Sequence, residues 1–292
     1  MTFDTFKDTI LSALTDYYGK DYTLSVRKIP KNNRIILDGL TIQKKGQNIS
    51  PTIYLNSYFS EFQDGTPMFA ILEEIKNTYA LHHPRENIDI RFFTDYENAK
   101  EHICMKLIHY EKNRELLKEV PHVRFLDLAV VFYYLISVMP GEQATILICN
   151  NHLPYWNVST DTLFEAAKIN TPRLLPYYFD DIFSVLKDVS DLSEFNENHI
   201  HPLYVLTNSE KLFGAATLLY PNLLSSIAQR LNQDFIILPS SLHEVLLLPA
   251  EHNDSFEEYA SIIQEVNSSE LSPEEILSDH AYYYSRKTDS IR

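Results

Sequence analysis

The stretch DFIILPSSLHEVLLLP, residues 234–249, places two dense apolar runs on either side of a short polar segment. Proline and serine are typical turn residues, because proline presets the backbone and serine hydroxyls bind local backbone groups. We therefore predict that Phe235–Leu238 and Val245–Leu248 are strands of one hairpin, joined by the loop Pro239–His243. Both strands are apolar at nearly every position, which favours a sheet covered on both faces.

The same loop raises an alternative, because a serine, a histidine and a carboxylate lie within four positions. Side chains alternate along a strand, so His243 and Glu244 would point to opposite faces and could not both serve Ser241. The chain also contains no G-x-S-x-G nucleophile elbow. We favour a hairpin loop and keep Ser241, His243 and Asn151 as candidate residues of a hydrolase assembled from distant parts of the sequence.

From about residue 121 the order strand, strand, helix occurs three times. Short turns between strands imply antiparallel pairing, and interspersed helices imply layers of both kinds. We predict an α+β fold of mostly antiparallel sheets, made of repeated strand-strand-helix units and packed with helices. The expected elements are strands at Phe125–Val138 and Ala144–Asn150 before a helix from residue 160, strands at Leu203–Leu206 and Ala215–Leu219 before a helix at 223–231, and the opening hairpin before a helix from Ser255.

The first 120 residues show a different order, so we divide the chain into 1–120 and 121–292, which could also form one continuous globule. The N-terminal part is expected to contain a helix, a hairpin and two further helices. Its expected elements are a helix at 3–18, strands at Tyr22–Ile29 and Arg34–Ile42, a helix from Thr66-Pro67, a strand at Ile88–Phe93 and a helix at Tyr96–Glu119. Near the C-terminus of the chain we also expect a helix from Ser272 and a strand at Tyr282–Tyr284.

Charge is unevenly distributed along the 292 residues. The net charge is −15; residues 1–120 contain 16 Lys and Arg against 17 Asp and Glu, whereas residues 121–292 contain 9 against 23. An acidic surface repels nucleic acid and anionic membranes. We expect a non-enzymatic protein that binds a macromolecular partner, such as a basic protein, through its acidic C-terminal part. The alternatives are a merely solvated acidic surface and a decoy of DNA charge.

Cysteine and hydropathy patterns indicate the compartment. Cys104 and Cys149 both lie in apolar runs, and no C-x-x-C pair exists, so we expect reduced thiols, as in cytosol. The N-terminus lacks the features of a signal peptide. The longest apolar-rich run, of about 15 residues, is too short to span a bilayer. We predict a cytoplasmic protein that does not bind membranes; its 19 tyrosines suit a dimer interface as well as a large core.

Metal and cofactor signals are sparse. His199 and His201 have the two-residue spacing that places side chains on one face of a strand, and Glu197 is near, so they are the candidate metal ligands. Zinc normally takes three or four protein ligands, and a surface loop explains these histidines more simply. No phosphate-binding Gly-rich motif occurs, and the chain has only six glycines. We therefore predict no cofactor.

Several longer stretches resemble a known family. These are DGLTIQKKGQNISPTIYLNSYF, RFLDLAVVFYYLI with ATILICNNHLPYW, AAKINTPRLLP, YVLTNSEKLFGAATLLYP, and FIILPSSLHEVLLLP with PEEILSDHAYYY. In this order they resemble the domain of unknown function 5688, found in gut clostridia, and more loosely the domain of unknown function 1444. The resemblance implies a full-length cytoplasmic bacterial protein with no missing catalytic domain, and it assigns no activity and no catalytic residue.

Overall fold

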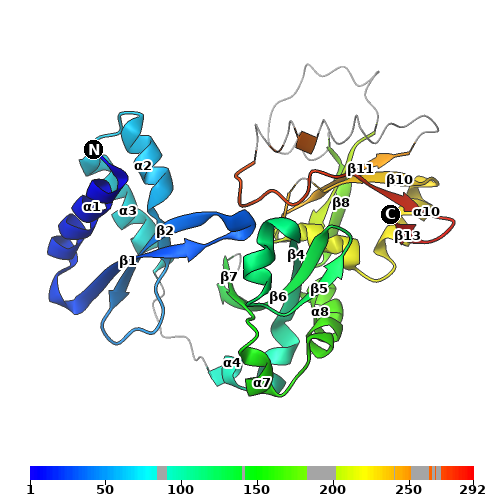
Figure 1. Cartoon of the computed structure of the whole chain (residues 1–292), viewed down its shortest axis with the longest axis horizontal. Coiled ribbons are helices and arrows are strands. Elements are labelled where there is room, and N and C mark those ends of the chain that lie inside the picture. Colours follow the sequence, from blue (N-terminus) through cyan, green and yellow to red (C-terminus); the bar gives the residue numbers. More distant parts are fainter. Residues whose placement is uncertain are drawn as a thin grey trace. The chain divides into compact units, whose positions relative to one another are not determined.

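The computed structural model describes residues 1–83, 91–139, 142–182, 202–239, 241–250, 263–264, 267 and 271–292. The chain forms two compact units, Met1–Arg91 and Phe92–Arg292 (Figure 1). All strand pairings among the described residues are antiparallel. The predicted α+β class with antiparallel sheets is therefore confirmed.

The N-terminal unit is a three-stranded sheet with helices packed on it. Its elements are α1 (Phe3–Tyr18), β1 (Tyr22–Pro30), β2 (Ile36–Lys44), β3 (Thr52–Tyr54), α2 (Leu55–Gln63) and α3 (Met68–His82). Thr2 caps α1, because its side chain accepts a hydrogen bond from the amide of Thr5. The predicted helix and hairpin are confirmed, and their apolar faces form a separate core of Phe6, Ile10, Leu14, Leu40, Ile42, Ile53, Leu55, Ile71 and Ile75.

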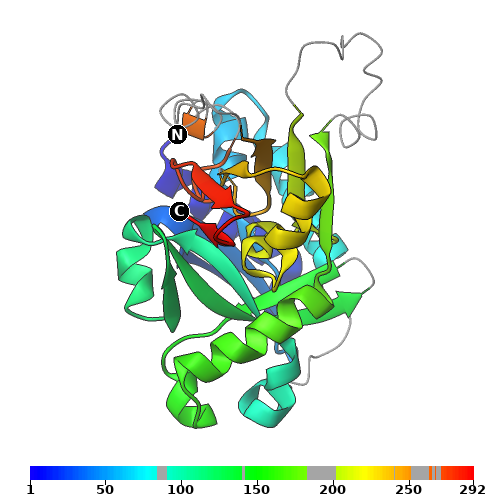
Figure 2. The same ribbon diagram turned by 90° about the vertical axis from the view of Figure 1, so that its right-hand side faces the viewer.

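The second unit contains a four-stranded sheet. In chain order its elements are α4 (Arg91–Thr94), α5 (Tyr96–Ala99), β4 (Ile103–His109), α6 (Arg114–Leu117), β5 (His122–Phe125), β6 (Leu128–Met139), β7 (Glu142–Leu147), α7 (His152–Trp156) and α8 (Thr160–Leu174). The long strand β6 pairs with β4, β5 and β7. Ser159 caps α8, the long green helix of Figure 2, which packs on β4.

The second unit also contains a six-stranded sheet. Its elements are β8 (Tyr177–Asp181), β9 (Tyr204–Asn208), the 3₁₀ helix η6 (Gly214–Leu219), α10 (Leu223–Leu231), β10 (Phe235–Leu238), β11 (Val245–Pro249), β12 (Tyr282–Ser285) and β13 (Ser290–Ile291). The strand order is β13-β12-β10-β11-β9-β8. The predicted hairpin is confirmed, with Phe235 opposite Pro249 and Leu238 opposite Leu246. The terminal strand at Tyr282–Tyr284 is confirmed as well.

Three local predictions are wrong. Residues 96–119 were expected to be one helix, but they contain β4, in which six of seven residues are buried. Because both faces of this strand are covered, its sequence lacks the alternation of apolar and polar residues that would distinguish a strand from a helix. Ala215–Leu219 is the helix η6 rather than a strand. Residues 272–275 form turns rather than a helix.

Some expectations meet the limits of the described residues. The strand at Ile88–Phe93 lies partly outside them, and its described end, from Arg91, belongs to the helix α4. The start of the helix from Ser255 lies outside them too. Residues 92–120, which we assigned to the N-terminal part, pack in the second unit, because β4 pairs with β6.

Candidate functional site

The loop between β10 and β11 uses its polar side chains to hold its own backbone. Ser241 is buried, and its Oγ accepts a hydrogen bond from the backbone amide of His243 at 3.0 Å. The His243 Nδ1 lies 2.9 Å from the carbonyl oxygen of Lys211, and the ring stacks on Phe213. The Ser241 hydroxyl is therefore engaged by a backbone amide of the loop and not by an imidazole.

The other candidates from the sequence lie apart from this loop. Asn151 is exposed in the turn that precedes α7, beside the four-stranded sheet. His199 and His201 lie outside the described residues. In the part of the chain that the structure describes, no three His, Cys, Asp or Glu side chains are grouped to hold a metal ion.

The loop also anchors a segment that comes later in the chain. The amide of Leu242 donates to the carbonyl of Glu275 at 2.9 Å, and the amide of Ser278 donates to the carbonyl of Pro239 at 3.0 Å. A β-bridge joins Ser241 to Ile276. The loop therefore positions the polar residues that follow Ile276.

Those residues converge on the carboxylate of Asp127, in the turn between β5 and β6. Ser278 Oγ donates to Asp127 Oδ2 at 2.8 Å, His280 Nδ1 lies 3.1 Å from the same oxygen, and the Tyr282 hydroxyl donates to Oδ1. Burial opposes ionisation of Asp127, but the hydrogen bonds from Tyr282, His280 and Ser278 outweigh it and hold the pKa of this carboxyl below its usual value. Burial and the Asp127 carboxylate raise the pKa of Tyr282, so this phenol remains a donor.

His109, the last residue of β4, completes this group, which we call the Asp127 network (Asp127, His109, Ser278, His280 and Tyr282). Its Nδ1 accepts a hydrogen bond from the amide of Lys112, and its Nε2 lies 3.8 Å from Asp127 Oδ2. Burial lowers the pKa of His109, so the ring is neutral and carries its proton on Nε2, on the side of Asp127. Beside the network, Lys112 Nζ lies 3.0 Å from Asp279 Oδ2.

Within the Asp127 network, His280 is the group best placed for chemistry. Its side chain is 70% exposed, while its Nδ1 is held by the partly buried carboxylate of Asp127. A carboxylate that orients an imidazole is the arrangement of a general base, with the second ring nitrogen available to a reactant. The network can therefore orient one exposed imidazole in a fixed direction.

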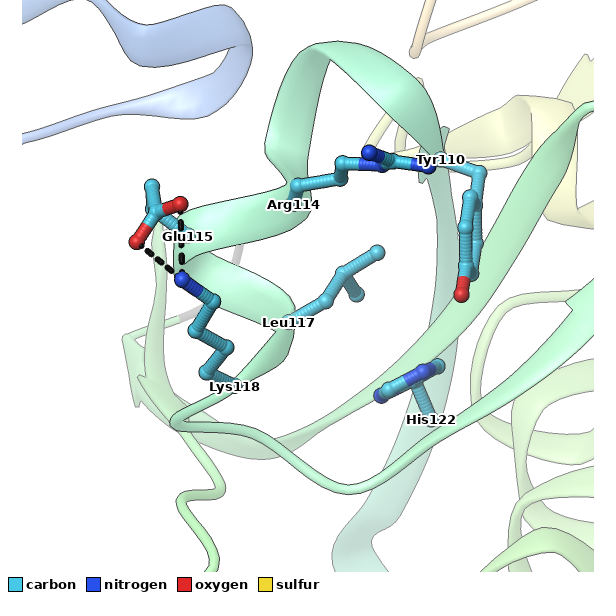
Figure 3. A pocket seen from close by; sticks show the side chains of 6 residues that line it. All are labelled: Tyr110, Arg114, Glu115, Leu117, Lys118 and His122. Carbon is cyan, nitrogen blue, oxygen red and sulfur yellow. Dashed lines mark hydrogen bonds and ion pairs between the residues drawn. The ribbon is translucent and has the colours of Figure 1, made fainter.

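An open cavity of about 390 Å³ lies beside the segment that follows β4 (Figure 3). We call it the Tyr110 pocket; its lining residues are Tyr110, Arg114, Glu115, Leu117, Lys118 and His122. Figure 3 shows the Leu117 side chain pointing into the middle, with Arg114 and Tyr110 to one side and His122 below. The walls carry three basic side chains and one carboxylate.

The ion pairs at the pocket are exposed ones. Arg114 Nε lies 2.7 Å from Glu111 Oε2, and Lys118 Nζ lies 2.7 Å from Glu115 Oε2, with more than half of each side chain exposed. Such pairs within one helical turn contribute little to stability, so they exchange partners easily. The Tyr110 ring is more firmly placed, because the Arg124 guanidinium lies 4.4 Å from its centre.

The last feature is the edge strand β8, at the end of the six-stranded sheet. The amide of Ile182 donates to Leu203, and the amide of Ser209 donates to Pro176. Bonded pairs alternate in an antiparallel ladder, so Tyr177 and Phe179 direct their backbone groups away from β9, whereas the amide of Asp181 donates to the Asp180 carboxylate at 2.8 Å. Among the described residues, β8 therefore pairs with another strand, β9, along one side only.

Comparison with protein families shows to which family the chain belongs. The family described as "Family of unknown function (DUF5688)" matches residues 3–286. The chain belongs to this family. The resemblance predicted from the sequence is thereby confirmed for DUF5688. No curated protein and no solved structure matches the chain.

The DUF5688 match covers every described residue of the Asp127 network, the Tyr110 pocket and β8. Sequence reasoning missed the Asp127 network, although a signal exists: Asp127 is the one carboxylate in the apolar stretch FLDLAVV, and Ser278 and His280 lie between apolar residues in ILSDHAYYY. No helix in the described ranges of this DUF5688 chain is both long and apolar enough to cross a bilayer.

Proposed function

We propose that this chain is a non-enzymatic bacterial protein of the cytoplasm that binds a basic segment of a partner protein at β8. An exposed sheet edge is a template for an added strand, and main-chain hydrogen bonds then supply affinity. The single observation that carries the proposal is that β8 is an end strand of its sheet among the described residues, with the backbone groups of Tyr177 and Phe179 directed away from β9.

The side chains of β8 suit such a partner. Tyr177 is 54% exposed and Tyr178 is 37% exposed, and exposed aromatic residues are frequent at protein interfaces. Asp180 and Asp181 add two carboxylates. Since Arg230 lies over the ring of Phe179 on one face of the strand, Lys or Arg side chains of a partner fit the opposite face, where Asp180 lies.

The negative charge of the C-terminal part favours a basic partner. Residues 121–292 contain 23 Asp and Glu against 9 Lys and Arg. Pairing of β8 with β8 of a second copy would bring two chains of net charge −15 together, and nucleic acid would be repelled in the same way. A basic polypeptide is attracted at long range, and salt should weaken its binding.

A labelled decapeptide of alternating Lys and Thr tests this proposal by fluorescence anisotropy. We expect saturable binding that weakens with salt, and loss of binding when alternate peptide nitrogens are methylated, because methylation removes the donors that an added strand needs. Equal binding of the methylated peptide would mean attraction by charge alone and would contradict the proposal. Self-association of the chain through β8, detected by analytical ultracentrifugation, would contradict it as well.

The matched variants change two charges each. Asp180→Asn with Asp181→Asn should weaken peptide binding about tenfold, the equivalent of about 1.4 kcal/mol. Asp64→Asn with Glu74→Gln removes the same charge from exposed positions of the N-terminal unit and should leave binding unchanged. Equal losses in both variants would show that net charge matters and the position of β8 does not.

A hydrolase is the second candidate function, because the loop Pro239–His243 positions the segment in which Asp127 orients His280. A general base of this kind contributes roughly 100-fold or more to a rate. Hydrolysis of p-nitrophenyl acetate should fall by that factor in His280→Gln and stay unchanged in His243→Gln. A rate that is the same in both variants and in the unaltered chain would contradict this candidate.

A further inference from the structure

The Tyr110 pocket combines a suitable size with a defined shape. Its volume of about 390 Å³ lies within the range of small-molecule sites, roughly 300–1,000 Å³. Leu117, which is 5% exposed, forms its apolar part. The rings of Tyr110 and His122 face each other edge to face, with 6.0 Å between their centres. The cavity therefore offers a small apolar and aromatic surface to one flat ring.

Basic groups surround this surface, in contrast to the acidic chain as a whole. Arg114, Lys118 and His122 line the cavity with Glu115 as the one carboxylate, and the Arg124 guanidinium lies over the Tyr110 ring. A guanidinium and an ammonium close together are typical of phosphate recognition, the first by paired hydrogen bonds and the second as a point charge. The exposed pairs of Arg114 with Glu111 and of Lys118 with Glu115 can be replaced by bonds to a ligand.

The backbone beneath the pocket is held in place before any ligand binds. The Asn150 side-chain amide donates to the carbonyl of Lys118, and the backbone amide of Asn150 donates to the carbonyl of Glu119, both at 2.8 Å. His122 Nδ1 lies 3.1 Å from the carbonyl oxygen of Val120, which leaves Nε2 as the ring nitrogen that a ligand can reach. Binding at a preformed site costs less conformational entropy, which favours affinity.

We propose that the Tyr110 pocket binds a small phosphate ester that carries one aromatic ring. The ring lies on Leu117 and against Tyr110, and the phosphate oxygens accept hydrogen bonds from Arg114 and Lys118. This site is separate from β8, so neither proposal depends on the other.

Phenyl phosphate is the minimal probe, and phenol and inorganic phosphate are its two halves. We expect saturable shifts in NMR spectra and an increase in thermal stability with phenyl phosphate, with an affinity about tenfold or more above that of either half. Inorganic phosphate that binds as tightly as phenyl phosphate would contradict recognition of the ring. Phenol that binds as tightly would contradict recognition of the phosphate, and absence of saturable binding would contradict the site.

Paired variants locate the binding. Arg114→Gln with Lys118→Gln should lower the affinity for phenyl phosphate about tenfold or more, because two charge-assisted hydrogen bonds are lost. Lys100→Gln with Lys168→Gln removes two cations that form the same kind of pair, with Glu97 and Glu165, away from the pocket. The second variant should bind as the unaltered chain does; an equal loss in both would contradict the assignment.

Discussion

His109 and Tyr110 are neighbours at the end of β4, yet their side chains belong to opposite environments. His109 is buried and belongs to the Asp127 network, where its Nδ1 accepts from the amide of Lys112 and its Nε2 faces Asp127. Tyr110 lines the open pocket, where Arg114 and Lys118 pair with exposed carboxylates. The backbone of Tyr110 leaves the strand with helical angles, φ −62° and ψ −56°, so one peptide bond separates the internal network from the open pocket.

The comparison shows how burial determines what a polar group can do. Asp127 accepts three hydrogen bonds in a partly buried place, and removing it would leave three donors without their acceptor, which is costly. Arg114 and Lys118 can lose their partners to water at little cost. Groups of the first kind stabilise the fold, and groups of the second kind remain available for a ligand.

The strongest test of this contrast removes the carboxylate at the centre of the network. Asp127→Ala should lower the free energy of unfolding of the second unit by about 3 kcal/mol, since Ser278, His280 and Tyr282 lose their shared acceptor. Urea unfolding followed by the fluorescence of Trp156, the one tryptophan of the chain, reports on this unit. Asp289→Ala, which removes the acceptor of one tyrosine only, is the control and should cost about 1 kcal/mol or less.

Acid should weaken the network in two stages. The folded pKa of His109 is lowered, so its contribution is present above the unfolded value of about 6.5 and declines as pH falls below it. The folded pKa of Asp127 is lowered too, so its contribution is present above about 3.9 and declines as pH falls towards the folded value.

Urea unfolding at pH 7, 5, 4 and 3 checks this pH dependence. When the pKa of a group differs by one between the folded and the unfolded state, the free energy of unfolding changes by about 1.4 kcal/mol. His109→Gln should flatten the decline that begins near pH 6.5, and Asp127→Asn should flatten the decline below pH 4. A decline that is the same in both variants and in the unaltered chain would show that other groups cause it.

The smallest expected effect compares two lysines on the two sides of this region. Lys112→Gln breaks the pair with Asp279, in which each side chain is 35% exposed, and should lower the free energy of unfolding by about 1 kcal/mol. Lys118→Gln breaks the more exposed pair with Glu115 and should change it by less than about 0.5 kcal/mol. Trp156 fluorescence in urea measures both, and a larger cost for Lys118→Gln would reverse the contrast.

The sequence was sufficient for elements whose pattern is local. The hairpin β10–β11 was predicted correctly because proline and serine interrupt two short apolar runs. β4 was mistaken for part of a helix because Ile103, Leu107 and Ile108 also recur at helical spacing, and strand burial on both faces removes any alternation. η6 was mistaken for a strand for the same reason, since its first five residues are buried.

The candidate sites were harder to predict because they depend on pairing between distant segments. The β4–β6 register puts His109 opposite Leu128, which brings Asp127 beside His109. Ser278 reaches Asp127 across 151 positions, through the contacts of the loop Pro239–His243. The lone carboxylate in an apolar stretch marked Asp127 as unusual, but its partners follow only from these tertiary contacts.

The place of β12 in its sheet has a consequence for the order of folding. β12 pairs with β10, and Ile236 meets Tyr283 only when the intervening residues close a loop, whereas β1 and β2 pair across a short turn. Closing a long loop costs more entropy, and distant contacts slow folding. We therefore expect the N-terminal hairpin to form before the sheet that carries Tyr282 to Asp127, so that the Asp127 network assembles only after β12 has paired with β10.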